Sequence, residues 1–134
     1  MNRPGTTPLC QRWGLLAATL VVVMSGTALR LVPTGLPPGV VKYGGSVLWG
    51  AMVYGLVAAL LLSPRRRIVA LAILVAVSVE LVRLVHAPWL DAFRLTVAGQ
   101  LLLGRIFSLW NLVAYATGIA AAALVDVRAR RRLA

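Results

Sequence analysis

The chain has 134 residues, of which 60% are hydrophobic, and its mean hydropathy is +0.90. A soluble domain of this length could not hide so much apolar surface, so the composition excludes an ordinary soluble protein and indicates a membrane protein. The net charge of +11 would suggest nucleic acid on a soluble chain, but here the basic residues stand mainly at the ends of apolar runs, where membrane topology and anionic lipid headgroups account for them.

The first apolar run extends over about residues 13–32, and Thr7-Pro8 offers a helix start because proline is tolerated at the first helical position. A run of about 20 residues is long enough to cross about 30 Å of hydrocarbon. Residues 25–28 are small and would suit cleavage of a signal peptide. The apolar run continues past them, which favours a retained span over a cleaved one.

Two further spans follow. Pro33, Pro37 and Pro38 mark a loop, after which a second span is predicted over about 41–62. A third is predicted over about 68–86, with Ser63 as its N-cap and Pro64 in its first turn. Pro88 ends this third span.

The segment over about 91–105 differs from the spans around it. It is apolar but short, roughly 14 residues, and it carries Arg94, Gln100 and Arg105. We therefore expect an interfacial or re-entrant helix here, with Asp91 as its N-cap. A last span is predicted over about 106–125, followed by an arginine-rich tail.

Four spans place nine basic residues on one side of the membrane and four on the other. The positive-inside bias then predicts a multi-pass protein of the bacterial inner membrane with both termini in the cytoplasm. The expected fold class is all-α integral membrane, a single domain over 1–134 formed by a four-transmembrane-helix bundle plus the short interfacial or re-entrant helix. The nine are Arg3, Arg12, Arg65, Arg66, Arg67, Arg128, Arg130, Arg131 and Arg132, and the four are Arg30, Lys42, Arg94 and Arg105.

Glu80 is the only acid inside a predicted span, about 18 Å along the helix from Ile68. A lone charge at that depth costs roughly 2.5–3.5 kcal/mol even on the lenient insertion scale. Arg83 lies three residues on, on the same helical face, and an ion pair or a protonated Glu80 would lower the cost. The pair either fixes helix packing or forms a polar site facing the protein interior, and both readings stay open.

A second polar group is predicted near the external face. Arg94 and Arg105 are eleven residues apart, close to three helical turns, so on a continuous helix they share a face and with Arg83 could gather an anion such as a lipid phosphate. The alternative is interfacial snorkelling, with Trp89 as a belt anchor. The candidate ligand-binding residues are Glu80, Arg83, Trp89, Arg94, Arg105, Asn111 and Tyr115.

No arrangement of nucleophile and base is visible in the sequence, so no catalytic residue is assigned. One cysteine and one histidine exclude an intrachain disulfide and a Cys/His metal cage. We expect no metal, no cofactor and no nucleic-acid partner. The expected partners are the bilayer, anionic lipids and a lipid-linked anion, while a protein partner or a homo-oligomer stays open.

Several stretches together resemble an uncharacterised bacterial membrane family, domain of unknown function 2809. The likeness covers predicted spans two to four, and its most specific part is the Ala-Pro-Trp-Leu…Arg segment ending at Arg94. The matching stretches are KYGGSVLWGA at 42–51, Glu80, HAPWLDAFR at 86–94, GQLLLG at 99–104, Phe107, and the Asn111, Tyr115 and Gly118 pattern.

The resemblance implies a small inner-membrane protein of four or five helices, distantly similar to the VanZ-like family linked to glycopeptide tolerance. It implies no activity. The positions carried over are Glu80, Pro88, Trp89, Arg94, Gly104 and Tyr115.

The chain departs from the family pattern at three polar positions. Ser46 and Asn111 replace expected acids, and Arg83 replaces an expected glutamine. These changes make the polar group more cationic, which favours an anionic ligand. We therefore predict an envelope-associated binding or accessory protein.

Two alternatives to this function are a membrane enzyme acting on a lipid-linked substrate, with Glu80 as acid or base, and a structural subunit of a larger membrane complex. The lack of a second acid near Glu80 argues mildly against the enzyme, because acid–base catalysis usually uses two groups.

Overall fold

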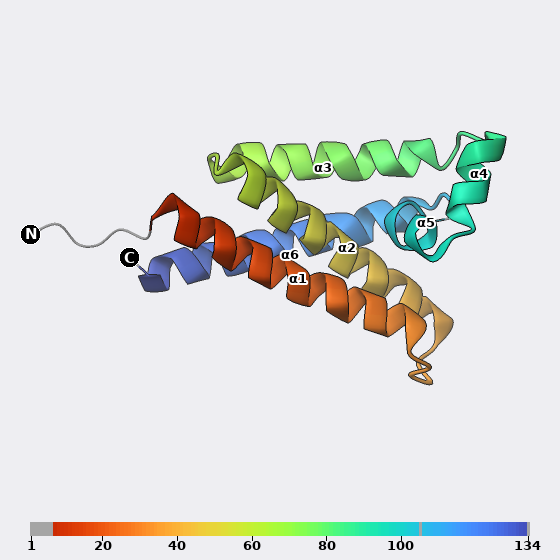
Figure 1. The fold of residues 1–134 in the computed structure, drawn as a ribbon, viewed down its shortest axis with the longest axis horizontal. Helices are drawn as coiled ribbons and strands as arrows, with labels where there is room; N and C mark the ends of the chain where they lie inside the picture. The colour runs from red at the N-terminus through yellow and green to blue at the C-terminus, as the bar shows by residue number, and fades with distance from the viewer. Residues whose placement is uncertain (1–6, 105, 134) are drawn as a thin grey trace, which may run out of the picture.

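The computed structural model describes residues 7–104 and 106–133, and every regular element in these ranges is a helix. This confirms the all-α prediction. Four helices of the described residues are long and two are short, and Figure 1 shows their arrangement. The helices are α1 Pro8–Leu31, α2 Pro38–Leu61, α3 Arg65–Val82, α4 Pro88–Arg94, α5 Val97–Leu102 and α6 Leu109–Leu133.

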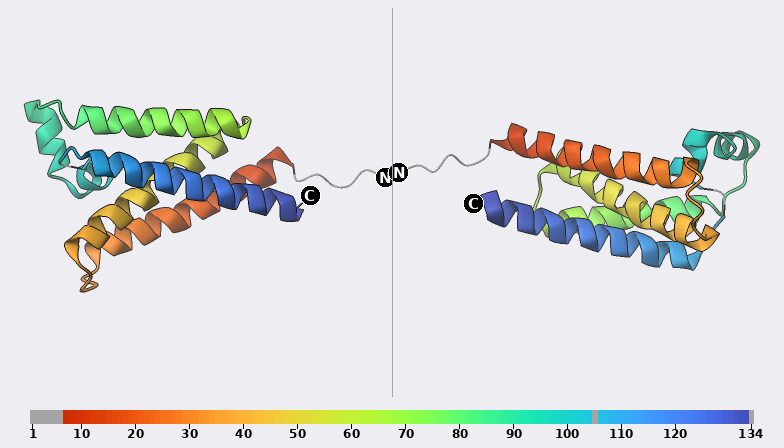
Figure 2. Two further views of the ribbon diagram at one scale, coloured as in Figure 1. Left: turned by 180° about the vertical axis from the view of Figure 1, so that it is seen from behind. Right: turned by 90° about the horizontal axis from the view of Figure 1, so that it is seen from below.

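The long helices run back and forth between two ends of the molecule (Figures 1 and 2). The start of α1, the α2–α3 turn and the end of α6 lie at one end, here called the terminal end. The α1–α2 loop, α4, α5 and the start of α6 lie at the other, here called the α4–α5 end.

Helix α2 is the centre of the packing, because α1, α3 and α6 all pack on it, and α3 also packs on α6. Helix α1 contributes little to the buried core, because Thr19 is its one buried residue. Helices α2 and α6 approach closely: a Cβ on Gly50 would overlap the backbone of Tyr115, and one on Gly118 would overlap the backbone of Val47. Glycine at both positions lets the two backbones meet, as small residues do between helices in lipid.

Helix α3 buries a single narrow line of side chains. Ile68, Ala72, Ala76 and Glu80 follow at four-residue intervals, so they lie one above another on the face toward α2 and α6. The three apolar members join the core, and Glu80 continues the line into a polar region at the α4–α5 end.

Three helices are long and apolar enough to cross a membrane: Pro8–Leu31, Pro38–Leu61 and Leu109–Arg132. Helix α3 is shorter, at 18 residues, and its first turn is the Arg65–Arg67 block. The described chain therefore has three candidate membrane spans, which coincide with the first, second and last spans that the sequence predicts.

Several predicted helix ends differ from the structure. Helix α1 does begin at Pro8, with the Thr7 hydroxyl accepting a hydrogen bond from the Cys10 amide. Ser63, however, is not the N-cap of α3. Leu62 ends α2 in a left-handed conformation, and the Ser63 hydroxyl instead donates to the Leu61 carbonyl, so Pro64 takes the cap position.

The predicted helix over 91–105 is two helices, α4 and α5. Pro88 at the first helical position starts α4 three residues before Asp91, so Asp91 lies in the first turn and is not the N-cap. Thr96 then opens α5, its hydroxyl accepting from the Gly99 amide. The break removes the continuous helix on which Arg94 and Arg105 were expected to share a face, and Arg105 itself lies outside the described residues.

Candidate functional site

A buried ion pair lies where α3 ends. The Glu80 side chain is fully buried and Arg83 is 7% exposed, and Arg83 Nη1 lies 2.6 Å from Glu80 Oε2. The contact is short but lies outside hydrogen-bond geometry, since this oxygen has no hydrogen-bond donor within the described residues. The two charges therefore neutralise each other inside the protein.

The other Glu80 oxygen faces the start of α6. The Ser108 amide donates to Glu80 Oε1 at 2.7 Å, and the Asn111 side-chain amide lies 3.4 Å from the same atom. Asn111 is in turn within 3.4 Å of the Ser46 hydroxyl on α2. One carboxylate thus connects α3, α6 and, through Asn111, α2.

Arg83 also donates to the segment between α5 and α6 and to α6 itself. Its Nε donates to the Leu103 carbonyl, Nη1 approaches the Ile106 carbonyl at 3.4 Å, and Nη2 donates to the Tyr115 hydroxyl at 2.6 Å. Gly104, at φ +67°, brings the chain close to the guanidinium. We call Glu80, Arg83, Asn111 and Tyr115 the polar centre, and its geometry anchors this segment to α3.

Of the predicted candidate residues, these four come together, and Trp89 and Arg94 do not join them. The Trp89 side chain is 74% exposed. Arg94 is buried but forms its own cluster, in which its guanidinium donates to the carbonyls of Val82 at 2.6 Å and Val85 at 2.9 Å. Val82 is the last residue of α3 and Val85 lies three residues beyond it, so Arg94 holds the chain where α3 ends.

All three acids of the chain are ion-paired with an arginine three or four residues further on. The pairs are Glu80–Arg83, Asp91–Arg94 and Asp126–Arg130. Asp126 also accepts from the Tyr54 hydroxyl at 2.9 Å, so its pair ties α6 to α2 near the terminal end. No acid is therefore left to neutralise the other described cations.

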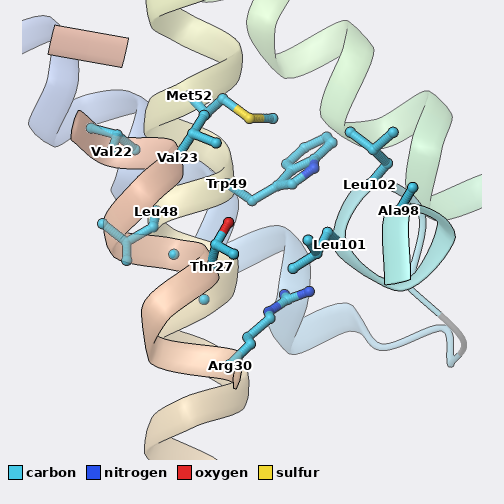
Figure 3. A pocket seen from close by; sticks show the side chains of 12 residues that line it. Val22, Val23, Thr27, Arg30, Leu48, Trp49, Met52, Ala98, Leu101 and Leu102 are labelled. Atoms are coloured by element: carbon cyan, nitrogen blue, oxygen red, sulfur yellow. The ribbon is translucent and has the colours of Figure 1, made fainter. Parts of the chain in front are cut away.

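One of those cations, Arg30, lines a pocket that sequence analysis did not single out. Arg30 lies in the last turn of α1, and its Nη1 donates to the Gln100 carbonyl at 3.0 Å. Figure 3 shows its guanidinium entering the pocket below the indole of Trp49, with Leu101 and Leu102 of α5 on the opposite side. The pocket encloses about 260 Å³ between α1, α2 and α5.

Apart from Arg30, the pocket walls are mostly aliphatic. A second donor is present, however: the Trp49 Nε1 atom is buried and has no hydrogen-bond acceptor among residues 7–104 and 106–133. The sequence does show Arg30 as a charge near the end of an apolar run. In the sequence analysis this charge was used only to assign membrane topology, so the pocket was missed.

No solved structure matches the chain. Residues 36–119, which include α2 to α5 and the polar centre, match the family described as Protein of unknown function (DUF2809). The more distant VanZ-like similarity is not borne out by this match. Because the match covers more than half of the sequence, the chain belongs to the DUF2809 family.

Proposed function

We propose that the chain is a four-span protein of the bacterial inner membrane that binds an anionic lipid or lipid-linked anion at its α4–α5 end. The observation that carries the binding proposal is Arg30, a half-buried arginine without a carboxylate partner that lines an apolar pocket. The class of function is envelope binding or accessory, and the ligand neutralises Arg30.

The fourth span in this proposal is α3. Eighteen residues at 1.5 Å each give about 27 Å, of which the part after the Arg65–Arg67 block gives about 22 Å, so the bilayer thins locally where α3 crosses it. Its Arg65–Arg67 block would lie among headgroups, and its one acid is paired and buried. The antiparallel course of α2, α3 and α6 supports this crossing (Figure 1).

The distribution of cations supports cytoplasmic termini. Of the described cations without a carboxylate partner, Arg12, the Arg65–Arg67 block and three arginines near the end of α6 belong to segments at the terminal end. Arg30 and Lys42 belong to segments at the α4–α5 end. The excess at the terminal end is the asymmetry that marks a cytoplasmic side.

The burial of Glu80 favours binding over the enzyme alternative. A general acid or base must reach the proton that it transfers. Glu80 is fully buried, with one oxygen against Arg83 and the other accepting from the Ser108 amide. In this proposal the polar centre holds the α5–α6 segment in place and thereby positions α5, one wall of the pocket.

Two experiments test these proposals. Cysteines introduced at each terminus should not be labelled by a reagent added outside intact cells. Labelling of either terminus from outside would overturn the topology.

Native mass spectrometry of the purified protein with phosphatidic acid should show binding that Arg30→Gln weakens about tenfold and that Lys42→Gln leaves within about twofold. Equal loss in both variants would mean that charge alone attracts the lipid.

A further inference from the structure

We infer that the pocket beside Arg30 holds one apolar chain of a phosphate-bearing lipid, with the phosphate at Arg30 and the chain running inward along α1 and α2. This inference rests on the proposed lipid binding and specifies its ligand: a lipid phosphate that carries a single chain.

The polar groups of the pocket call for an acceptor-rich ligand. Arg30 has five guanidinium N–H donors, and one nitrogen is used by the Gln100 carbonyl. The Trp49 N–H is a donor without a partner in the described chain. A phosphate has several oxygens that accept charge-assisted hydrogen bonds, and a buried donor such as the indole N–H is stabilised by gaining an acceptor.

The apolar walls continue away from Arg30 along two helices. Val23 and Val22 lie seven and eight residues before Arg30, about 10–12 Å deeper along α1. On α2, Met52 lies seven residues beyond Gly45, about 10 Å deeper in the same direction. The pocket therefore has a charged end near the α4–α5 end and an aliphatic end toward the middle of the helices.

The size of the pocket favours a single chain. Pockets for drug-sized ligands measure about 300–1,000 Å³, and this one encloses about 260 Å³. A lipid with two chains would have to leave one chain outside, so it would bury less of its apolar surface on binding.

The position of the pocket gives the ligand a route from the bilayer. The wall on one side is α1, which packs chiefly on α2 and buries only Thr19. The opposite wall is α5, a six-residue helix whose main contacts are with α4. A chain can enter sideways between these two elements without crossing the packed α2–α3–α6 core.

The test compares four probes by native mass spectrometry and competition: lysophosphatidic acid with one chain, phosphatidic acid with two, monoolein without phosphate, and inorganic phosphate. The purified full-length protein should bind lysophosphatidic acid about tenfold more tightly than monoolein or inorganic phosphate, and more tightly than phosphatidic acid.

Three variants locate the ligand. Ala98→Phe fills the pocket from α5 and should weaken lysophosphatidic acid binding about tenfold, and Val23→Phe should do so from α1. Trp49→Phe keeps the ring, removes the N–H and should weaken binding about threefold. Leu74→Phe, on the exposed face of α3 outside the pocket, is the matched control and should leave binding unchanged.

Failure of this inference differs from failure of the proposed function. If both phosphate lipids bind equally, depend on Arg30 and ignore Ala98→Phe and Val23→Phe, the single-chain pocket is wrong but anionic-lipid binding stands. If neither lipid binds better than monoolein, the proposed function is wrong as well. If inorganic phosphate competes as well as the lipids do, the site takes a free anion and the inference is overturned.

Discussion

Two arginines near the α4–α5 end, Arg83 and Arg30, differ in how their donors are used. Arg83 faces a carboxylate, two backbone carbonyls and a tyrosine hydroxyl, all within the protein. Arg30 has one hydrogen bond, to the Gln100 carbonyl, and no carboxylate partner in the described chain, and it lines an apolar pocket. Charge alone therefore does not identify a binding residue: the donors of Arg83 are used within the protein, whereas Arg30 has donors that the proposed ligand can use.

The largest expected effect comes from Glu80→Gln. This change leaves the buried Arg83 without its counter-charge and should lower the free energy of unfolding by about 3–5 kcal/mol. Unfolding in mixed micelles titrated with SDS measures it. Combining Glu80→Gln with Arg83→Gln should recover part of the loss, because the stranded charge is removed. Strictly additive losses would show that the two residues do not interact.

Arg94→Gln asks whether a second buried arginine behaves as Arg83 does. It removes charge-assisted bonds to the Val82 and Val85 carbonyls and should cost about 1.5–3 kcal/mol of unfolding free energy, with no change in lipid affinity. Arg94→Lys keeps the charge but loses the forked geometry, so it should be intermediate in the same measurement. A loss of lipid binding with unchanged stability would instead place Arg94 in a ligand site.

Gly104→Ala tests how firmly Arg83 is held. Both Gly104 and Gly35 have positive φ, so alanine at either should cost about 1–2 kcal/mol from the backbone. At Gly104 the new Cβ would also lie 2.8 Å from Arg83 Nη2, whereas at Gly35 nothing lies within 4 Å. We expect Gly104→Ala to cost about 1–3 kcal/mol more than Gly35→Ala in SDS unfolding. Equal costs would mean that Arg83 moves freely.

The smallest stability effect is expected from Gly45→Ala, the counterpart at Arg30. Its Cβ would lie 2.7 Å from Arg30 Nε, but Arg30 has a single hydrogen bond to give up. The helix gains about 1 kcal/mol from replacing an interior glycine, so we expect stability to change by less than about 1 kcal/mol. Lipid affinity should nevertheless fall several-fold, since the guanidinium is displaced. Unchanged affinity in native mass spectrometry would contradict a ligand at Arg30.

Local spacing made much of the fold and the polar centre predictable. Apolar runs identified α1, α2 and α6, and the three-residue separation of Glu80 and Arg83 placed both on one helical face. Asn111 and Tyr115, which the sequence offered as candidate ligand-binding residues, lie beside this pair.

The remaining features depend on contacts that no local pattern records. The Leu103 and Ile106 carbonyls and the Ser108 amide bind the pair through the backbone, which every residue carries alike. The break between α4 and α5 does have a sequence signal, because Thr96 can cap a helix by accepting a hydrogen bond from the Gly99 amide three residues later. The apolar residues on both sides of Thr96 make this signal easy to miss. Arg30 is a pocket residue only because α5, some 70 residues away in the sequence, lies against it.

The acid–arginine pairs have a consequence for how the protein is made. Each acid meets its arginine within one helical turn of the same segment, so the pairing needs no other helix to be present. As α3 leaves the ribosome, Glu80 and Arg83 can neutralise each other before α6 is synthesised. If α3 crosses the membrane as proposed, it can insert with its charges already neutralised, and the contacts with Ser108, Asn111 and Tyr115 can form afterwards.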